Sequence, residues 1–223
     1  MTSDRTTAAV RVRDLTRRFG RRWALRGVDL EVGPATVVAL LGANGTGKTT
    51  LLRVLSTLLR ATAGRVEVLG RALPEEGDAV RRRTALMTPG GHSYEELTGR
   101  ENLLFAVRMC GIRPSPDEVE HALESVDLAG AADTRVRGYS TGMRKRLELA
   151  RLGLRRLDLV LLDEPFVSLD DDGVELVQDA IGHWRRDGAT VLIASHRVED
   201  ATRQADRIVR LDRGRVARDE ARP

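Results

Sequence analysis

The feature that most constrains this chain is a short apolar run that leads directly into a glycine-rich turn and then into a helical stripe. Residues 37–41 read VVALL, a continuous apolar stretch of strand length that is typical of a parallel strand buried on both faces. The turn follows with GANGTGKT over residues 42–49, and leucines recur at helical spacing over residues 48–59. This order of strand, loop and helix predicts an α/β fold with an anion-binding site at the end of the strand.

The turn fits the pattern G-x-x-x-x-G-K-[ST], in which each fixed residue has a physical task. Its glycines let backbone amides turn inward on a phosphate, and the helix that follows presents unpaired N–H groups and its positive end. Lys48 supplies a point charge at the β- and γ-phosphates, while the hydroxyl of Thr49 can hold Mg²⁺. The residues expected to contact the nucleotide here are Gly42, Asn44, Gly45, Thr46, Gly47, Lys48, Thr49 and Thr50.

A glycine-rich turn that binds no ligand is the simpler alternative for this segment. Against it stands the scarcity of lysine, because the chain contains only Lys48 and Lys145, and one of them falls on the position that the pattern requires. We therefore expect a nucleotide site at this turn.

A second apolar run ends in two carboxylates. Residues 159–164 read LVLLDE, so a buried strand would deliver Asp163 and Glu164 to the sheet edge where α/β proteins bind ligands. Asp163 suits the Mg²⁺ shell, directly or through water, and Glu164 can orient or deprotonate an attacking water. Alone, the pair could equally be an acidic loop after a strand. Together with the turn at residues 42–49 it favours a catalytic site.

Hydrophobic periodicity predicts the remaining organisation. Strands are expected at residues 10–15, 24–32, 65–69, 190–194 and 207–211, and helices at 100–110, 116–126, 141–154, 174–186 and 198–205. Strands that alternate with helices predict an α/β core with a mixed sheet, preceded by an N-terminal antiparallel β subdomain. The mostly helical stretch of about residues 84–154 is expected to be a helical subdomain inserted into a single domain of residues 1–223.

Composition excludes several classes of protein. Charged residues make up 31% of the chain, and no run approaches the ~20 apolar residues of a membrane span or the core of a secretory signal. A lone cysteine, Cys110, cannot form an internal disulfide, which favours a reducing compartment. A net charge of +4 and 3% aromatic residues argue against a dedicated nucleic-acid binder, so no nucleic-acid partner is expected.

Further segments, in order along the chain, resemble the nucleotide-binding domain of ATP-binding cassette (ABC) proteins. The resemblance covers about residues 10–216 and has the P-loop core of that family. Residues 139–146, YSTGMRKR, look like its signature segment, residues 168–170, SLD, like its D-loop, and residues 97–102, LTGREN, like the start of its helical subdomain. His196, which follows a predicted strand, looks like the switch histidine, and Phe19 like the aromatic residue that stacks on adenine.

The resemblance implies a Mg²⁺-dependent ATPase in which Lys48, Glu164 and His196 are catalytic and Thr49 and Asp163 hold the metal. It implies that Ser140 and Gly142 meet the γ-phosphate of the opposite subunit in a head-to-tail dimer, and that Asp170 helps to register that dimer. Taken singly, the same residues have simpler interpretations: Ser140 as a helix cap, Asp170 as a turn residue, His196 as a structural histidine and Phe19 as a core side chain.

Two departures from the family pattern stand out. In the signature segment, Thr141 replaces the first of two glycines and Met143 replaces a glutamine, a form that resembles exporters. The family also has a glutamine between core and helical subdomain that contacts Mg²⁺ and the membrane partner. Here Pro89 or Gly90 occupies that slot, so no metal ligand is expected there, and His92 is only a weak substitute.

These observations predict an ATPase subunit that powers transport, in the direction of export, through a separate integral-membrane subunit. Docking would use the segment around residues 89–101. The resemblance further implies a second ATPase subunit, most simply a second copy, and a cytoplasmic protein held peripherally on the inner face of the membrane. Residues 51–68 look most like a haem-exporter ATPase. A soluble ABC ATPase that acts on a scaffold protein in Fe–S assembly, or one that acts on nucleic acid or the ribosome, remains the alternative.

Overall fold

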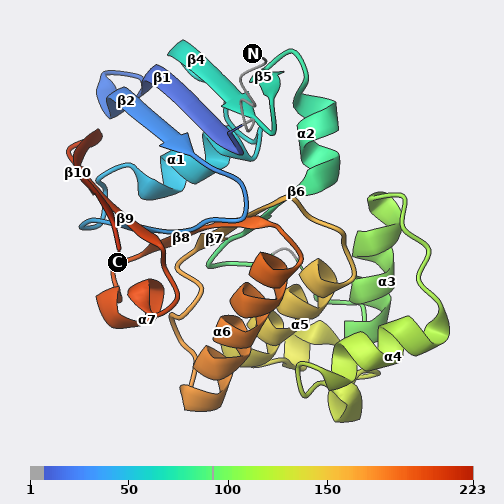
Figure 1. Ribbon diagram of the computed structural model, residues 1–223. Helices are drawn as coiled ribbons and strands as arrows, with labels where there is room; N and C mark the ends of the chain where they lie inside the picture. The colour runs from blue at the N-terminus through green and yellow to red at the C-terminus, as the bar shows by residue number, and fades with distance from the viewer. Residues whose placement is uncertain (1–7, 92, 223) are drawn as a thin grey trace, which may run out of the picture. The chain divides into compact units, whose positions relative to one another are not determined.

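The computed structural model describes residues 8–91 and 93–222, which divide into two compact units (Figure 1). Unit 1 contains the segments up to Leu86, Leu157–Glu164 and the chain from Ile181 onward, and unit 2 contains Met87–Arg156 and Pro165–Ala180. The long helix α6 (Asp171–Arg186) therefore contributes residues to both units. Whether residues 84–154 form a subdomain of their own stays a prediction.

Unit 1 begins with a four-stranded antiparallel sheet, here called sheet A. Its strand order is β2-β1-β4-β5, with bounds Val10–Phe19 for β1, Arg22–Val32 for β2, Ala63–Val68 for β4 and Arg71–Leu73 for β5. Along β1, Val10, Val12 and Leu15 are buried while the intervening arginines are not, so one face of sheet A packs on the core.

A six-stranded mixed sheet, here called sheet B, forms the rest of the unit 1 core. Its order is β10-β9-β3-β8-β7-β6, with bounds Arg215–Ala221, Arg207–Asp212, Val37–Leu41, Thr190–Ser195, Leu159–Asp163 and Thr84–Met87. Strands β9, β3, β8 and β7 pair in parallel and β10 pairs antiparallel to β9. Every residue of β3, β7 and β8 is buried, as their continuous apolar sequences predict. The mixed sheet with an antiparallel β subdomain confirms the predicted fold class.

Helix α1 (Lys48–Leu55) lies between the two sheets of unit 1 (Figure 1). Its buried side chains, Leu51, Leu52 and Leu55, join valines and leucines of both sheets in one hydrophobic cluster. The helix is shorter than the leucine spacing predicts. It stops at Leu55 because Ser56 caps its end and Thr57 takes a left-handed φ of 69°, which no helix interior accommodates.

Apart from β6, three elements of unit 1 were not predicted from the sequence: β5, β10 and the helix α2 (Gly77–Arg83). All three are short and mostly exposed, so they lack the apolar periodicity on which a prediction depends. The expectation that the helical stretch begins near residue 84 was wrong at its start, because Thr84–Met87 forms the strand β6. The short helix α7 (Val198–Thr202) follows β8.

Unit 2 is helical. It contains α3 (Gly99–Met109), α4 (Pro116–Glu124), α5 (Thr141–Gly153) and the first residues of α6. The N-terminus of α3 is fixed by a reciprocal capping box between Thr98 and Glu101, and that of α4 by the same arrangement between Ser115 and Glu118. Within the described residues no helix has the length and apolar character needed to cross a membrane.

Candidate nucleotide site

The turn at residues 42–49 lies in unit 1 between β3 and α1, as predicted. Two of its glycines are required by close backbone approaches. Gly47 has a φ of 110°, and a Cβ there would lie 2.7 Å from the carbonyl oxygen of Ala24. A Cβ on Gly42, whose φ is 153°, would lie 2.4 Å from the carbonyl oxygen of Leu211. No other residue type fits at either position, so the shape of the turn depends on both glycines.

Lys48 is buried, and its ammonium group lies inside the turn. Nζ donates hydrogen bonds to the carbonyl oxygens of Gly42 at 2.6 Å and Ala43 at 3.2 Å. The hydroxyl of Thr46 also donates to Ala43, at 2.9 Å. The charge therefore sits where a phosphate held by the turn would meet it.

The metal residues named from the sequence meet in unit 1. Oγ1 of Thr49, in the first turn of α1, donates to Oδ1 of Asp163, at the end of β7, over 3.0 Å. Asp163 is only 2% exposed. Burial raises the pKa of its carboxyl group, the Thr49 hydrogen bond opposes that change, and the neighbouring charge of Glu164 adds to it.

Hydroxyl and carboxylate oxygens are donors that Mg²⁺ prefers, so this pair fits the metal by type. The described residues contain no cluster of three or more His, Cys, Asp or Glu side chains that could bind a metal by themselves. A magnesium ion here would need further oxygens from a bound phosphate or from water.

Glu164 has its backbone and carboxylate fixed by the strand beside it. Its φ is 51° and its amide donates to the carbonyl oxygen of Ala194 at 2.8 Å. Oε2 accepts from the Ser195 hydroxyl at 3.1 Å and from the backbone amide of His196 at 3.3 Å, and it lies 2.9 Å from Nδ1 of His196. The structure thus brings together Glu164 and His196, which are 32 residues apart in sequence.

Ser195 is a residue of this candidate site that sequence reasoning missed. It is fully buried at the end of β8, accepts from the amide of Arg197 at 3.0 Å and donates to Glu164. A serine directly before the candidate switch histidine, at the end of a continuous apolar strand, was the available signal.

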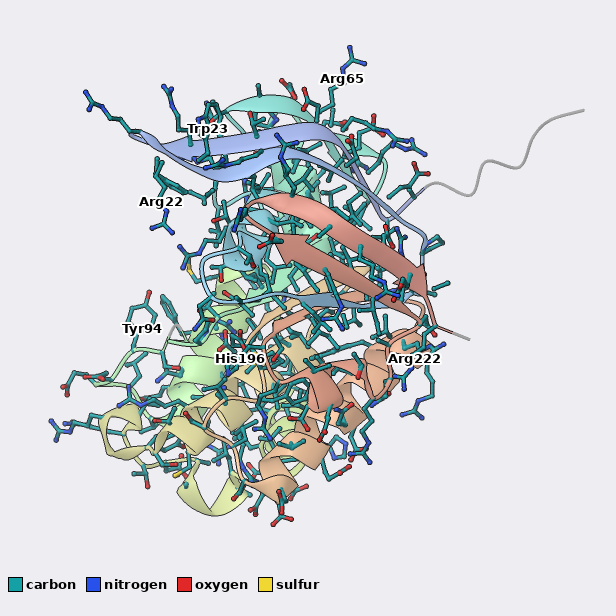
Figure 2. All side chains as sticks on the ribbon, turned by 90° about the vertical axis from the view of Figure 1, so that its left-hand side faces the viewer. Arg22, Trp23, Arg65, Tyr94, His196 and Arg222 are labelled. Carbon is teal, nitrogen blue, oxygen red and sulfur yellow. The ribbon has the colours of Figure 1, made fainter. Side chains whose placement is uncertain are left out.

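Phe19 ends β1 on the hairpin that leads into β2. Its ring is 45% exposed, which contradicts the alternative of a simple core side chain. The guanidinium of Arg17 lies 4.6 Å from the ring centroid, a cation–π contact that holds the ring from one side. Figure 2 shows Arg22 and Trp23 at the end of this hairpin, and Nη2 of Arg22 lies 3.4 Å from the position of a Cβ on Gly45.

The signature residues lie in unit 2. The Ser140 hydroxyl accepts from the amide of Met143 at 3.2 Å and caps α5, so the simpler interpretation of this serine also holds. Oδ1 of Asp170 accepts from the amide of Gly173 at 2.9 Å, in the first turn of α6. Ser140, Gly142 and Asp170 line one open hollow of unit 2, so the structure brings these three residues together.

Pro89 and Gly90, in the slot where the family has a glutamine, are both exposed and lie in a turn closed by a 3.1 Å hydrogen bond from the amide of Gly91 to the carbonyl of Thr88. Neither residue has a side-chain oxygen, nitrogen or sulfur atom that could bind a metal. His92 lies outside the described residues. The carboxylate of Glu148, on α5, is 3% exposed, and its Oε2 lies 3.6 Å from where a Cβ on Gly91 would be.

A family model described as ABC transporter matches residues 25–167. The chain belongs to the ABC transporter family. It is 43% identical over 210 residues to the daunorubicin resistance ATP-binding protein DrrA3 of Streptomyces coeruleorubidus, covering 93% of this chain and 66% of that protein. It is 38% identical over 175 residues to the cytochrome c biogenesis ATP-binding export protein CcmA of Cupriavidus necator, covering 78% and 77% of the two chains.

Among solved structures, an ATP-binding subunit of an ABC transporter is 27% identical and superimposes with a TM-score of 0.87, covering 96% of this chain and 90% of that one. The chain spans 66% of the length of each of the first two relatives, slightly less than two thirds. The family resemblance inferred from the sequence is therefore confirmed.

Proposed function

We propose that this ABC family chain binds Mg·ATP and hydrolyses it to drive transport, in the direction of export, through a separate membrane subunit. The observation that carries the proposal is the single cluster in unit 1 that joins the turn lysine, the Thr49–Asp163 pair and the fixed carboxylate of Glu164. A turn that binds nothing would not need a buried ammonium group, a buried carboxylate and a second carboxylate held by two neighbours.

The turn and Lys48 would bind the triphosphate. Its amides and the start of α1 provide hydrogen bonds to the phosphate oxygens, and Lys48 would exchange its two carbonyl partners for the β- and γ-phosphates. Phe19, held by Arg17 on one side, offers its exposed ring for stacking on adenine. Asn44, Gly45, Thr46 and Thr50 remain proposed contacts on the same loop.

Thr49 and Asp163 would hold Mg²⁺, which supplies positive charge to the phosphate oxygens when bound. Glu164 would orient an attacking water or accept its proton, because its carboxylate is aimed by Ser195 and His196. Positioning and charge stabilisation carry most of the catalysis in phosphoryl transfer, so the hydrogen bonds that fix Glu164 matter as much as its basicity.

The hollow formed by Ser140, Gly142 and Asp170 belongs to unit 2 and has no catalytic group of its own. We propose that it meets the γ-phosphate bound by a second copy of the chain, as the signature segment implies. The N-terminus of α5, with the Ser140 hydroxyl and the amide of Gly142 beside it, is suited to an anion. Each ATP site would then be complete only in a head-to-tail dimer.

Export is favoured over import because the relatives described above are an ATP-binding protein of daunorubicin resistance and an ATP-binding export protein of cytochrome c biogenesis. The membrane partner, docking through the segment around residues 89–101, follows from the same family. With such a partner, the chain would lie on the cytoplasmic face of a membrane as a peripheral subunit. Because Pro89 or Gly90 stands in place of the family glutamine, ATP binding would be coupled to the membrane partner without that glutamine.

Two measurements test the function. Titration of the purified chain with Mg·ATP by calorimetry should give saturable heat, and phosphate release should follow and stop when the metal is chelated. Absence of heat would contradict the nucleotide site. Purification from detergent-solubilised membranes should recover an integral-membrane protein with this chain, whereas recovery of a soluble scaffold protein or of ribosomes would favour the alternative class.

A further inference from the structure

The second lysine of the chain is buried in unit 2. Lys145 lies in the second turn of α5, the helix that Ser140 caps, and its side chain is almost fully shielded, at 4% exposure. Its Nζ donates to the carbonyl oxygen of Pro165 at 3.1 Å and to that of Val167. An ammonium group taken out of water is costly unless it is well hydrogen-bonded, and here backbone carbonyls provide those bonds.

The two carbonyls belong to a short loop whose position in the chain is informative. Pro165 directly follows Glu164, and the loop leads through Val167 to Asp170 at the start of α6. Between the two carbonyls, the side chain of Phe166 is completely buried. Lys145 therefore binds the backbone on both sides of a buried aromatic residue, and this fixes the path of the loop from its first residue.

The neighbours of Lys145 on α5 show that the loop contact is specific to this residue. Arg146, next in sequence, is directed to the acidic side chains of Asp127 at 3.4 Å and Asp170 at 3.8 Å. Arg151, farther along the helix, pairs with Glu148 at 2.8 Å. Both arginines bind carboxylates, and Arg146 also donates to the carbonyl oxygen of Val126 at 3.3 Å. The hydrogen bonds to the carbonyls of Pro165 and Val167 come from Lys145.

A hydrophobic residue of similar length could fill the same space, so packing alone does not require a charge here. What a methionine could not do is hold two carbonyl oxygens of a loop that has no regular secondary structure between β7 and α6. The charge provides directed bonds from the signature helix to that loop.

We propose that Lys145 is a positioning residue for hydrolysis: within unit 2 it ties the helix of the signature segment to the loop of residues 165–170, which ends at Asp170 in the hollow shared with Ser140 and Gly142. Lys145 does not touch the nucleotide. It sets the backbone of that loop, so its loss lowers turnover and leaves ATP affinity in place. This assignment rests on the ATPase function proposed above.

Three variants test this role. Lys145→Met keeps the chain length and removes the donors, Lys145→Gln keeps an N–H donor, and Arg151→Met is the matched control because it removes a positive charge from the same helix without touching the loop. Kd for Mg·ATP, KM and kcat are measured for each, together with hydrogen–deuterium exchange over residues 164–172 and the thermal midpoint.

We expect Lys145→Met to lower kcat at least tenfold with KM and Kd within threefold of wild type, and to speed exchange over residues 164–172 but not over residues 42–49. Lys145→Gln should recover part of both effects. Arg151→Met should lower the thermal midpoint with kcat unchanged. Unchanged kcat in folded Lys145→Met, or a kcat loss in Arg151→Met of the same size, would overturn the proposal.

The exchange measurement keeps the proposal testable where turnover is not informative. If Lys145→Met does not fold, Lys145→Gln must still show faster exchange over residues 164–172 than wild type, and equal exchange would overturn the assignment. If the wild-type chain shows no hydrolysis at all, the proposed ATPase function fails, while the exchange comparison still decides whether Lys145 holds the loop.

Discussion

Nδ1 of His196 lies 2.9 Å from Oε2 of Glu164. With Glu164 ionised, Nδ1 must carry the hydrogen and donate it, which leaves Nε2 of the neutral ring as an acceptor. The neutral ring can then accept from a water but cannot donate to a phosphate oxygen. A hydrogen bond from His196 to the γ-phosphate requires either a doubly protonated ring or release of Glu164.

Ser195 is expected to contribute to turnover through Glu164. Ser195→Ala removes one of the donors to Oε2 and should slow hydrolysis about tenfold, since a hydrogen bond to a charged group contributes roughly 1.5–3 kcal/mol. ATP affinity should stay the same. Ser56→Ala is the control, because Ser56 is also buried in unit 1 but donates to the carbonyl of Arg53. Steady-state phosphate release gives the comparison, and equal rates for both variants would remove Ser195 from this role.

Glu164→Gln should bind Mg·ATP with wild-type affinity and hydrolyse it about 10²–10⁴-fold more slowly, the range lost with a general base. The amide keeps the shape of the side chain and can still accept from Ser195 and His196. Because ATP is not consumed, the variant should accumulate as a nucleotide-bound dimer in size-exclusion chromatography. Normal turnover would exclude Glu164 as the base.

Lys48→Ala should weaken ATP binding by roughly 10- to 100-fold, because a charge-assisted hydrogen bond to phosphate is worth about 1.5–3 kcal/mol. Calorimetric titration measures the change. Arg53→Ala, which removes an exposed positive charge from the same helix, should leave affinity within twofold, on the order of the effect of a solvent-screened charge. An unchanged Kd in Lys48→Ala would contradict the role assigned to the turn.

Hydrolysis per chain should fall on dilution, because Ser140 and Gly142 of one copy would complete the site of another. At low concentration the total rate of phosphate release should rise with the square of the chain concentration. The rate per chain should become constant once the dimer is populated. Light scattering on the same samples gives the oligomeric state. A constant rate per chain from a monomer would contradict shared sites.

Glu148 is expected to make stability depend on pH. Burial raises the pKa of its carboxyl group to about 7 from an ordinary value of 4.5, against the opposing charges of Arg151 and Lys145. The folded chain therefore binds the proton more tightly than the unfolded chain. The contribution of Glu148 to the free energy of unfolding is most favourable below pH 4.5. It is lost as pH rises to about 7, so the chain is less stable by about 3 kcal/mol at higher pH.

Glu148→Gln removes this titration. The variant should lose the decline in unfolding free energy that the wild type shows between pH 4.5 and about 7, and its gain over wild type should be largest above pH 7. Urea unfolding at several pH values measures both. Parallel pH profiles for the two proteins would contradict the assignment. Glu118→Gln, at an exposed capping position of α4, serves as the control for removal of a carboxylate.

The elements predicted most accurately from the sequence are those defined by continuous apolar runs or bounded by glycines. The strand at Val37–Leu41 matches its predicted bounds, and α5 differs from its prediction by one residue. The predicted ends of helices were wrong where the backbone leaves the helix although the apolar spacing continues. Helix α1 ends at Leu55 because the backbone turns away at Thr57, while leucines continue at helical spacing.

Contacts between strands were beyond sequence reasoning. Glu164 and Ser195 are far apart in the chain and meet because β7 and β8 are parallel neighbours, with Asp163 opposite Ala194. The carbonyl partners of Lys145 could not be predicted either. Every residue has a backbone carbonyl, so the sequence does not show which carbonyls accept a hydrogen bond from a lysine.

The ammonium group of Lys48 is held by the backbone of its own turn. Gly42 and Ala43 offer their carbonyl oxygens to the Lys48 ammonium, so an arriving triphosphate swaps one set of oxygen partners for another. The affinity of the turn for a triphosphate is then governed by how much better phosphate oxygens satisfy that cation than two peptide carbonyls do.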